Sequence, residues 1–299
     1  MPMNQTELKQ LTTIPEAEKG EFQKLIREYR KKFIRPPRDT VDQIFNSRAD
    51  MLNKVQGEHN ISEVIHELRE AAYISFLEDE ARFNTEVLKA IGEKLSTPRQ
   101  ILSSIIEQSN LYGRPKDELI ALVKLICGEY AGRISPYIYE LSLSNTQSRR
   151  SRAGKTFEQV IYEMYRTFKF DFVSQGEVGK STFKDKGLGK MVDSLLPSIA
   201  AFEKRRDKVI IGTMKTTLRE RWQEVIEEIA RTGLPRIYLL TMDDDISENK
   251  AVQMGKHNVV LVVPKSVKQK PSLIGLENII SFESYFLEEI PETLKFWKK

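Results

Sequence analysis

The sequence predicts an α/β protein in which an all-helical N-terminal part, residues 1–140, precedes an α/β domain, residues 141–299. Two observations support this fold class. Apolar residues in the first half recur at helical spacing, with no strand-like alternation. In the second half, five short apolar runs alternate with helical segments, which is typical of a mixed sheet flanked by helices.

The helical half begins with a segment of 18 residues, 16–33. Pro15 suits the first turn of that helix, and the Pro36-Pro37 step ends it. Five more segments with helical spacing follow, with breaks at Gly57, at Pro98 and at residues 113–115. These segments are 41–55, 61–76, 83–95, 101–111 and 118–130.

The second half changes character after Pro136 and the polar stretch 142–151, where a helix over residues 155–168 is expected. The five runs predicted as strands are 170–174, 190–196, 208–215, 236–241 and 258–263. The helices expected between or after them are 218–232, 247–254 and 282–287. We therefore predict a five-stranded mixed sheet.

Composition excludes several classes of protein. The chain has one cysteine, Cys127, so it cannot form an intramolecular disulfide, and its three histidines are too scattered for a cysteine–histidine zinc site. The apolar stretches fall far short of the roughly 20 residues that span a bilayer. The first ten residues lack the apolar core of a signal peptide. We expect a soluble, cytoplasmic protein without a membrane partner.

Charge is distributed unevenly along the chain. Residues 1–145 hold 20 basic and 22 acidic side chains, whereas residues 146–299 hold 27 and 21, a net charge of +6. Clusters of cations stand at residues 27–38, 149–155 and 204–208. Such clusters favour a polyanion partner such as DNA, because neutralised phosphates release counterions. Solvated helix faces are the alternative interpretation.

An acid and a lysine in consecutive predicted strands are the candidate chemistry. Asp193 lies inside the apolar run 190–196, and Lys215 ends the next run. A buried acid needs a partner, and Lys215 is suitable if the two strands are neighbours. The carboxylate could hold Mg²⁺ while the lysine serves the attacking water in phosphodiester hydrolysis. By spacing alone, a structural ion pair is the more common outcome.

Further candidates lie on the helix after Lys215. Glu228 could supply another oxygen ligand, and spacing alone does not choose between it and its neighbours Glu224 and Glu227. The run Arg219-Glu220-Arg221 is matched chemically to G·C pairs, because arginine contacts guanine and glutamate accepts from cytosine. A charge cluster at a helix start is the alternative.

The block Asp193…Lys215-Thr-Thr-Leu-Arg219-Glu220-Arg221…Glu228 resembles the CCGG family of type II restriction endonucleases, in the PD-(D/E)XK superfamily. It looks most like the branch of the EcoRII catalytic domain, PspGI and their CCNGG-cutting relatives. A second stretch, SRRSRAGKTFEQVI at residues 148–161, resembles the family's first catalytic helix and aligns Glu158 with its upstream glutamate. Val192 stands where the PD motif has proline.

The resemblance implies a restriction-endonuclease fold and a Mg²⁺-dependent enzyme that cuts both DNA strands at a palindromic or pseudopalindromic site containing CC and GG. Asp193, Glu228 and Glu158 would hold the metal, and Lys215 would serve the water. Residues 219–221 would read the half-site. Contacts to phosphates or to neighbouring base edges would come from basic residues of the second motif, which are Arg149, Arg150 and Arg152.

The same resemblance implies a homodimer or higher oligomer, and a matching DNA methyltransferase that is not a physical partner. The helical part, 1–140, would embrace DNA, dimerise or do both. Two other functions stay open: a repair or junction nuclease of the same fold, and a non-catalytic DNA-binding regulator. The acidic run Asp243–Asp245 is interpreted as capping the following helix rather than as a metal site.

Overall fold

The computed structural model describes residues 12–109, 111–219 and 221–298, and it divides the chain into two compact units. The first unit comprises residues 1–36 and 74–151, and the second comprises residues 37–73 and 152–299. The expected division after residue 140 differs from this one. Two long helices, α5 (Ile61–Lys94) and α8 (Ser135–Thr167), each contribute to both units, so the unit boundaries fall inside helices.

The first unit is helical. It contains α2 (Glu16–Phe33), α6 (Ser96–Gln108), α7 (Lys116–Arg133) and the adjoining parts of α5 and α8. Its core includes Phe22, Phe83 and Tyr137, with the rings of Phe22 and Tyr137 in edge contact at 5.3 Å between centroids. The helix expected over residues 155–168 begins earlier, at Ser135, as part of α8. Helix α8 continues through residues 142–151, where most side chains are exposed and where the buried Asn145 lies one turn after the buried Leu141.

The second unit is built on a six-stranded mixed sheet in the order β1-β2-β3-β4-β5-β6. The strands are β1 (Val173–Ser174), β2 (Ser194–Leu196), β3 (Ile210–Lys215), β4 (Ile237–Thr241), β5 (Val259–Val263) and β6 (Ile279–Ser281). Strands β1, β2 and β3 pair antiparallel, and β3 to β6 pair parallel. The expected count of five strands is wrong, because β6 lies between the run 258–263 and the helix expected over 282–287, where no strand was predicted.

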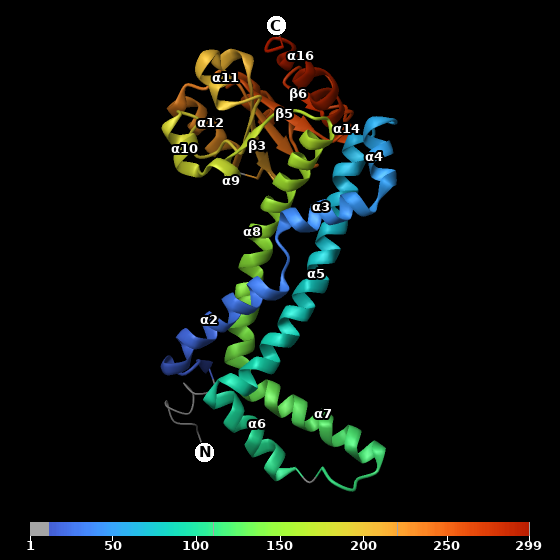
Figure 1. Ribbon diagram of the computed structural model, residues 1–299, viewed down its shortest axis with the longest axis vertical. Helices are drawn as coiled ribbons and strands as arrows, with labels where there is room; N and C mark the ends of the chain where they lie inside the picture. The colour runs from blue at the N-terminus through green and yellow to red at the C-terminus, as the bar shows by residue number, and fades with distance from the viewer. Residues whose placement is uncertain (1–11, 110, 220, 299) are drawn as a thin grey trace. The chain divides into compact units, whose positions relative to one another are not determined.

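Helices cover both faces of this sheet (Figure 1). One face packs on the start of α5, the end of α8, α3 (Pro37–Ser47), α4 (Ala49–Gln56), and the C-terminal helical segments α15 (Phe282–Ser284), η2 (Tyr285–Glu289) and α16 (Ile290–Lys295). The other packs on α10 (Lys180–Asp185), α11 (Ile199–Lys204), α12 (Arg221–Thr232), α13 (Glu248–Lys256) and α14 (Lys265–Lys268). The short helix α9 (Gln175–Val178) follows β1, and the turn η1 (Arg206–Lys208) precedes β3.

Burial explains the strand assignments. Strands β2 and β4 are buried at every residue, as expected for strands covered by helices on both faces.

No helix within the described ranges is long and apolar enough to cross a membrane.

Candidate active site

The acid and the lysine lie on neighbouring strands. Asp193 immediately precedes β2, and Lys215 ends β3. Because β2 and β3 are antiparallel, with Ser194 paired to Gly212, the start of β2 meets the end of β3. The ammonium Nζ of Lys215 lies 3.7 Å from Oδ2 of Asp193. Both side chains are largely buried, with 13% of Lys215 and 14% of Asp193 exposed.

Hydrogen bonds hold the Asp193 carboxylate in place. Its Oδ2 accepts from the backbone N–H of Met214 at 2.6 Å and from the hydroxyl of Thr213 at 3.3 Å. Burial raises the pKa of Asp193, and the positive charge of Lys215 and these donors oppose that rise. All of these contacts reach Oδ2, so within the described part of the chain Oδ1 is left for an additional ligand.

Two residues missed by the sequence reasoning support this pair. The hydroxyl of Tyr162 donates to the backbone carbonyl of Asp193 at 2.9 Å, and Tyr162 is one helical turn after Glu158 on α8. Thr213 lies two residues before Lys215 on β3, so the two side chains share a face of the strand. The periodicity of helix and strand could have identified both residues once Glu158 and Lys215 were chosen.

Glu158 belongs to the same electrostatic environment. Burial, followed by the negative charge of Asp193, raises the pKa of Glu158 to about 7, and Lys215 opposes that rise. An acid is destabilised in its charged form by low polarity and by a nearby like charge. The structure therefore brings Glu158, Asp193 and Lys215 together, from α8, the start of β2 and the end of β3.

Glu228 is placed differently. It is 7% exposed, whereas Glu224 and Glu227 on the same helix α12 are exposed. Its carboxylate accepts from the backbone N–H of Lys190 and from Arg231. Burial raises the pKa of Glu228, but Arg231 and Lys190 outweigh it and the pKa is lowered.

Gly189 is required at this contact. It has a φ of +80°, and an added Cβ would lie 1.9 Å from Oε1 of Glu228. Glu228 thus faces the loop before Asp193. Within the described ranges, no group of three or more acidic, histidine or cysteine side chains is arranged to hold a metal ion.

The predicted recognition residues follow β3. Arg219 is exposed and has a φ of +35°, in the left-handed region that non-glycine residues rarely adopt. Glu220 lies outside the described residues, and Arg221 begins α12. Leu218, just before Arg219, is fully buried, and its backbone N–H donates to Oδ2 of Asp243 at 2.6 Å.

The interpretation of Asp243–Asp245 as a helix cap is wrong. Helix α13 is capped by Ser247, whose hydroxyl accepts from the N–H of Lys250. Asp243 instead follows β4 and contacts the loop after β3, because the two strands are parallel neighbours with Lys215 paired to Thr241.

The basic residues of the second motif have different surroundings. Arg149, in the first unit, binds the buried carboxylate of Glu80 through Nε and Nη2. Arg152, in the second unit, donates to the hydroxyl of Thr40 at 3.2 Å. Arg150 is exposed. The structure thus gives Arg149 and Arg152 intramolecular contacts that sequence spacing did not reveal.

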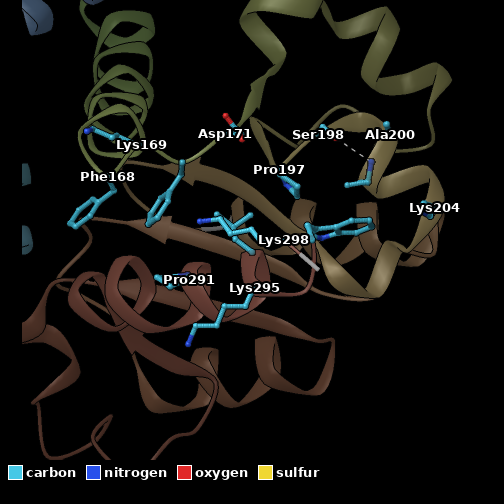
Figure 2. A pocket seen from close by; sticks show the side chains of 14 residues that line it. Phe168, Lys169, Asp171, Pro197, Ser198, Ala200, Lys204, Pro291, Lys295 and Lys298 are labelled. Carbon is cyan, nitrogen blue, oxygen red and sulfur yellow. Dashed lines mark hydrogen bonds between the residues drawn. The ribbon is translucent and has the colours of Figure 1, made fainter.

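A cavity of about 690 Å³ lies elsewhere in the second unit (Figure 2). Its lining comes from the segment after α8, from the start of α11 and from the C-terminal segment, and it includes Phe170, Pro197 and Lys298. Pro197 follows the end of β2, whereas Asp193 precedes its start. The cavity is therefore separate from the acid–lysine pair.

Solved structures share this fold. Metal-depleted Ecl18kI in complex with uncleaved DNA is 28% identical to this chain, with a TM-score of 0.73, and the match covers 94% of this chain and 86% of that one. The complex of restriction endonuclease PspGI with substrate DNA has a TM-score of 0.54 at 16% identity, covering 92% and 93%. The fold therefore defines a protein of the restriction endonuclease class.

Sequence comparison establishes the family. The EcoRII C-terminal family model matches residues 126–286. The type II restriction enzyme SsoII of Shigella sonnei is 32% identical over 282 residues, covering 93% of this chain and 84% of that enzyme. EcoRII of Escherichia coli is 26% identical over 140 residues, covering 44% and 31%. The chain belongs to the EcoRII C-terminal family and is a type II restriction enzyme, a site-specific deoxyribonuclease, as the motifs predicted.

Proposed function

We propose that this enzyme hydrolyses both strands of double-stranded DNA in a Mg²⁺-dependent reaction, at a palindromic or pseudopalindromic site containing CC and GG. Sites of the CCGG, CCNGG or CCWGG type, with or without specified flanks, fit the proposal. The observation that carries it is the largely buried pair of Asp193 and Lys215, 3.7 Å apart, next to Glu158. A cytoplasmic location is part of the same prediction.

The donor set at this pair fits a hard divalent cation. Asp193 keeps Oδ1 for a ligand, and Glu158 supplies a second carboxylate within electrostatic reach. Mg²⁺ usually takes one or two protein carboxylates and fills its remaining positions with water and substrate oxygens. Ligation by Glu228 would require its carboxylate to leave the backbone amide of Lys190. When bound, Mg²⁺ would acidify water and offset phosphate charge.

Lys215 serves the reaction as a positioned cation. Its ammonium is held beside Asp193 in a largely buried site, where it can orient the attacking water and stabilise negative charge on the phosphate in the transition state. Glu158, with a pKa of about 7, can accept a proton near neutral pH. Thr213 and Tyr162 hold Asp193 in place and so preserve the geometry.

Recognition is assigned to residues 219–221, and phosphate contacts to residues 149, 150 and 152. Arg219 is exposed four residues after Lys215, so a base-reading residue would lie next to the cleavage centre. Arg150 is exposed, whereas Arg149 and Arg152 already bind Glu80 and Thr40, so phosphate contact by these two would be shared with those partners. A matching methyltransferase would protect the host's own sites.

The enzyme is proposed to act as a homodimer or higher oligomer. A DNA site with twofold symmetry has one scissile bond on each strand, so two active sites related by the same symmetry match it. Helix α7 supports it: none of its described residues is buried, and its exposed apolar side chains include Leu119, Ile120, Val123 and Leu125. An apolar surface of this kind marks an interaction site. The helical first unit thus supplies a face for a second copy of the chain.

Cleavage of plasmid DNA tests the function. With Mg²⁺ the wild type should give discrete fragments whose sequenced ends reveal the site and overhang. Asp193→Asn and Lys215→Ala should abolish cleavage, at least about 1,000-fold, while site-specific binding is retained. Asp185→Asn and Lys184→Ala are matched controls, because both residues are exposed on α10, and these variants should cut normally.

The other outcomes point to other functions. A smear, or cutting that depends on DNA structure, would favour a repair or junction nuclease of the same fold. Absence of cutting with every divalent cation would favour a non-catalytic DNA-binding regulator.

A further inference from the structure

The loop between β3 and α12 joins the proposed catalytic lysine to the proposed recognition residues. Only three residues, 216–218, separate Lys215 from Arg219. A loop this short sets where Arg219 can lie relative to the cleavage centre. Arg219 also has a positive φ of 35°, which a non-glycine residue keeps only when its surroundings determine it.

Leu218 fixes this loop immediately before Arg219. Its side chain is fully buried in the core beneath α12, and its backbone N–H donates to Oδ2 of Asp243 at 2.6 Å. The side chain anchors the loop to the core, and the amide anchors it to the end of β4. Two anchors on one residue restrict both its position and the direction in which the backbone leaves it.

Asp243 is itself held by two further hydrogen bonds. Its backbone N–H donates to the hydroxyl of Thr241 at 3.1 Å, and its Oδ1 accepts from the N–H of Asp245 at 3.0 Å. Its two carboxylate oxygens therefore bind two backbone amides. Oδ2 binds the amide of Leu218, which follows β3, and Oδ1 binds that of Asp245, which follows β4. Thr241, two residues before Asp243, pairs with Lys215 in the parallel register. Asp243 therefore lies close to the end of β3, where Lys215 is.

We propose that Asp243 is a positioning residue for DNA recognition: through the amide of Leu218, it sets the conformation from which Arg219 reads the site. This inference rests on the proposed function, in which Arg219 contacts bases. Asp243 does not touch DNA in this scheme. Its effect should therefore appear in discrimination between cognate and other DNA rather than in general DNA affinity.

The test compares Asp243→Ala with Asp244→Ala. Asp244 is the exposed neighbour, so both variants remove one negative charge from the same loop and change nonspecific attraction to DNA equally. Binding to a duplex carrying the wild-type cleavage site and to one lacking it is measured without metal, and cleavage gives kcat and KM. Arg219→Ala is the reference for lost recognition.

We expect Asp243→Ala to lower the ratio of cognate to non-cognate affinity at least about tenfold, as loss of a base contact does. Asp244→Ala should leave that ratio unchanged. Asp243→Asn keeps one carbonyl acceptor and should fall between them. Thermal melting of each variant shows whether it is folded, and Asp243→Asn keeps the test valid if Asp243→Ala does not fold.

Three results separate the inference from the function. If the wild type cuts at no specific site, the proposed function fails and the inference fails with it. If Arg219→Ala loses discrimination and Asp243→Ala behaves like Asp244→Ala, only the inference is overturned. An equal loss of cognate and non-cognate binding in Asp243→Ala also overturns it, because it indicates general structural damage.

Discussion

The charge state of Glu158 depends on its neighbours in the fold. Its pKa of about 7 lies well above the ordinary 4.5 of a glutamate, because it is largely buried and faces the charge of Asp193. The unfolded chain loses this proton near pH 4.5, and the folded chain retains it to about pH 7. Folding therefore becomes less favourable as pH rises between these values, and the full penalty applies above pH 7.

We predict that the melting temperature of the metal-free wild type falls relative to that of Glu158→Gln as pH rises from 5 to 8. Glutamine cannot ionise, so the variant lacks this penalty. Mg²⁺ should stabilise the wild type more at pH 8 than at pH 5, since the metal competes with the proton. Differential scanning calorimetry with and without Mg²⁺ measures both effects.

The exposed Glu177 provides the control, because Glu177→Gln should melt in parallel with the wild type at every pH. A constant difference between Glu158→Gln and wild type across this range would contradict the assignment of Glu158.

Two helices of the first unit are joined by a contact that changes how Arg149 is interpreted. Arg149 on α8 binds Glu80 on α5, whose side chain is only 3% exposed. Removing the arginine leaves a buried carboxylate without that partner. A buried charge that loses its partner destabilises a fold more than the loss of an exposed pair does.

We predict that Arg149→Ala lowers the free energy of unfolding by roughly 1–3 kcal/mol, whereas Arg150→Ala changes it by less than about 0.5 kcal/mol. Arg150 is the matched control, since it is adjacent, exposed and equally charged. Urea unfolding measures the difference. Adding Glu80→Gln to Arg149→Ala should recover part of the loss, because the amide is easier to bury.

DNA affinity at several salt concentrations then separates the two roles of Arg149. A variant that loses stability but keeps the salt dependence of the wild type has lost a structural contact. A shallower salt dependence, after the stability has been restored by Glu80→Gln, would identify a phosphate contact.

At the scale of the whole molecule, the proposed assembly depends on the apolar surface of α7. Leu125 is 66% exposed, although it is one of the larger apolar residues of the chain. Burial of such a surface against a second copy would offset the entropy of association. The enzyme is therefore expected to be a dimer or larger in solution.

We predict that Leu125→Glu lowers the mass measured by sedimentation equilibrium toward that of one chain and reduces double-strand cleavage in favour of nicking. Lys124→Glu, at the neighbouring exposed position, is the control for added negative charge and should keep the wild-type mass. An oligomer that is unaffected by Leu125→Glu would place the interface on another surface.

Much of the fold was readable from local patterns. The runs around Ile210–Lys215, Ile237–Thr241 and Val259–Val263 are strands within one or two residues of the prediction, because buried strands are apolar along most of their length. The strand β6 was not predicted, since it is only three residues long and, unlike β2, was not recognised as part of a longer apolar run. The continuity of α8 was missed because polar residues occupy an exposed face of a real helix.

The sequence by itself determined the family, the identity of the candidate acids and the location of the basic residues. Only the tertiary structure decided which of these meet: Glu158 with Asp193 and Lys215, Glu228 with the loop at Lys190, and Asp243 with Leu218. The physical reason is the distance along the sequence over which each kind of interaction acts. Helical and strand periodicity depend on neighbours a few residues away, whereas these contacts join residues 25 or more apart through strand register and helix packing.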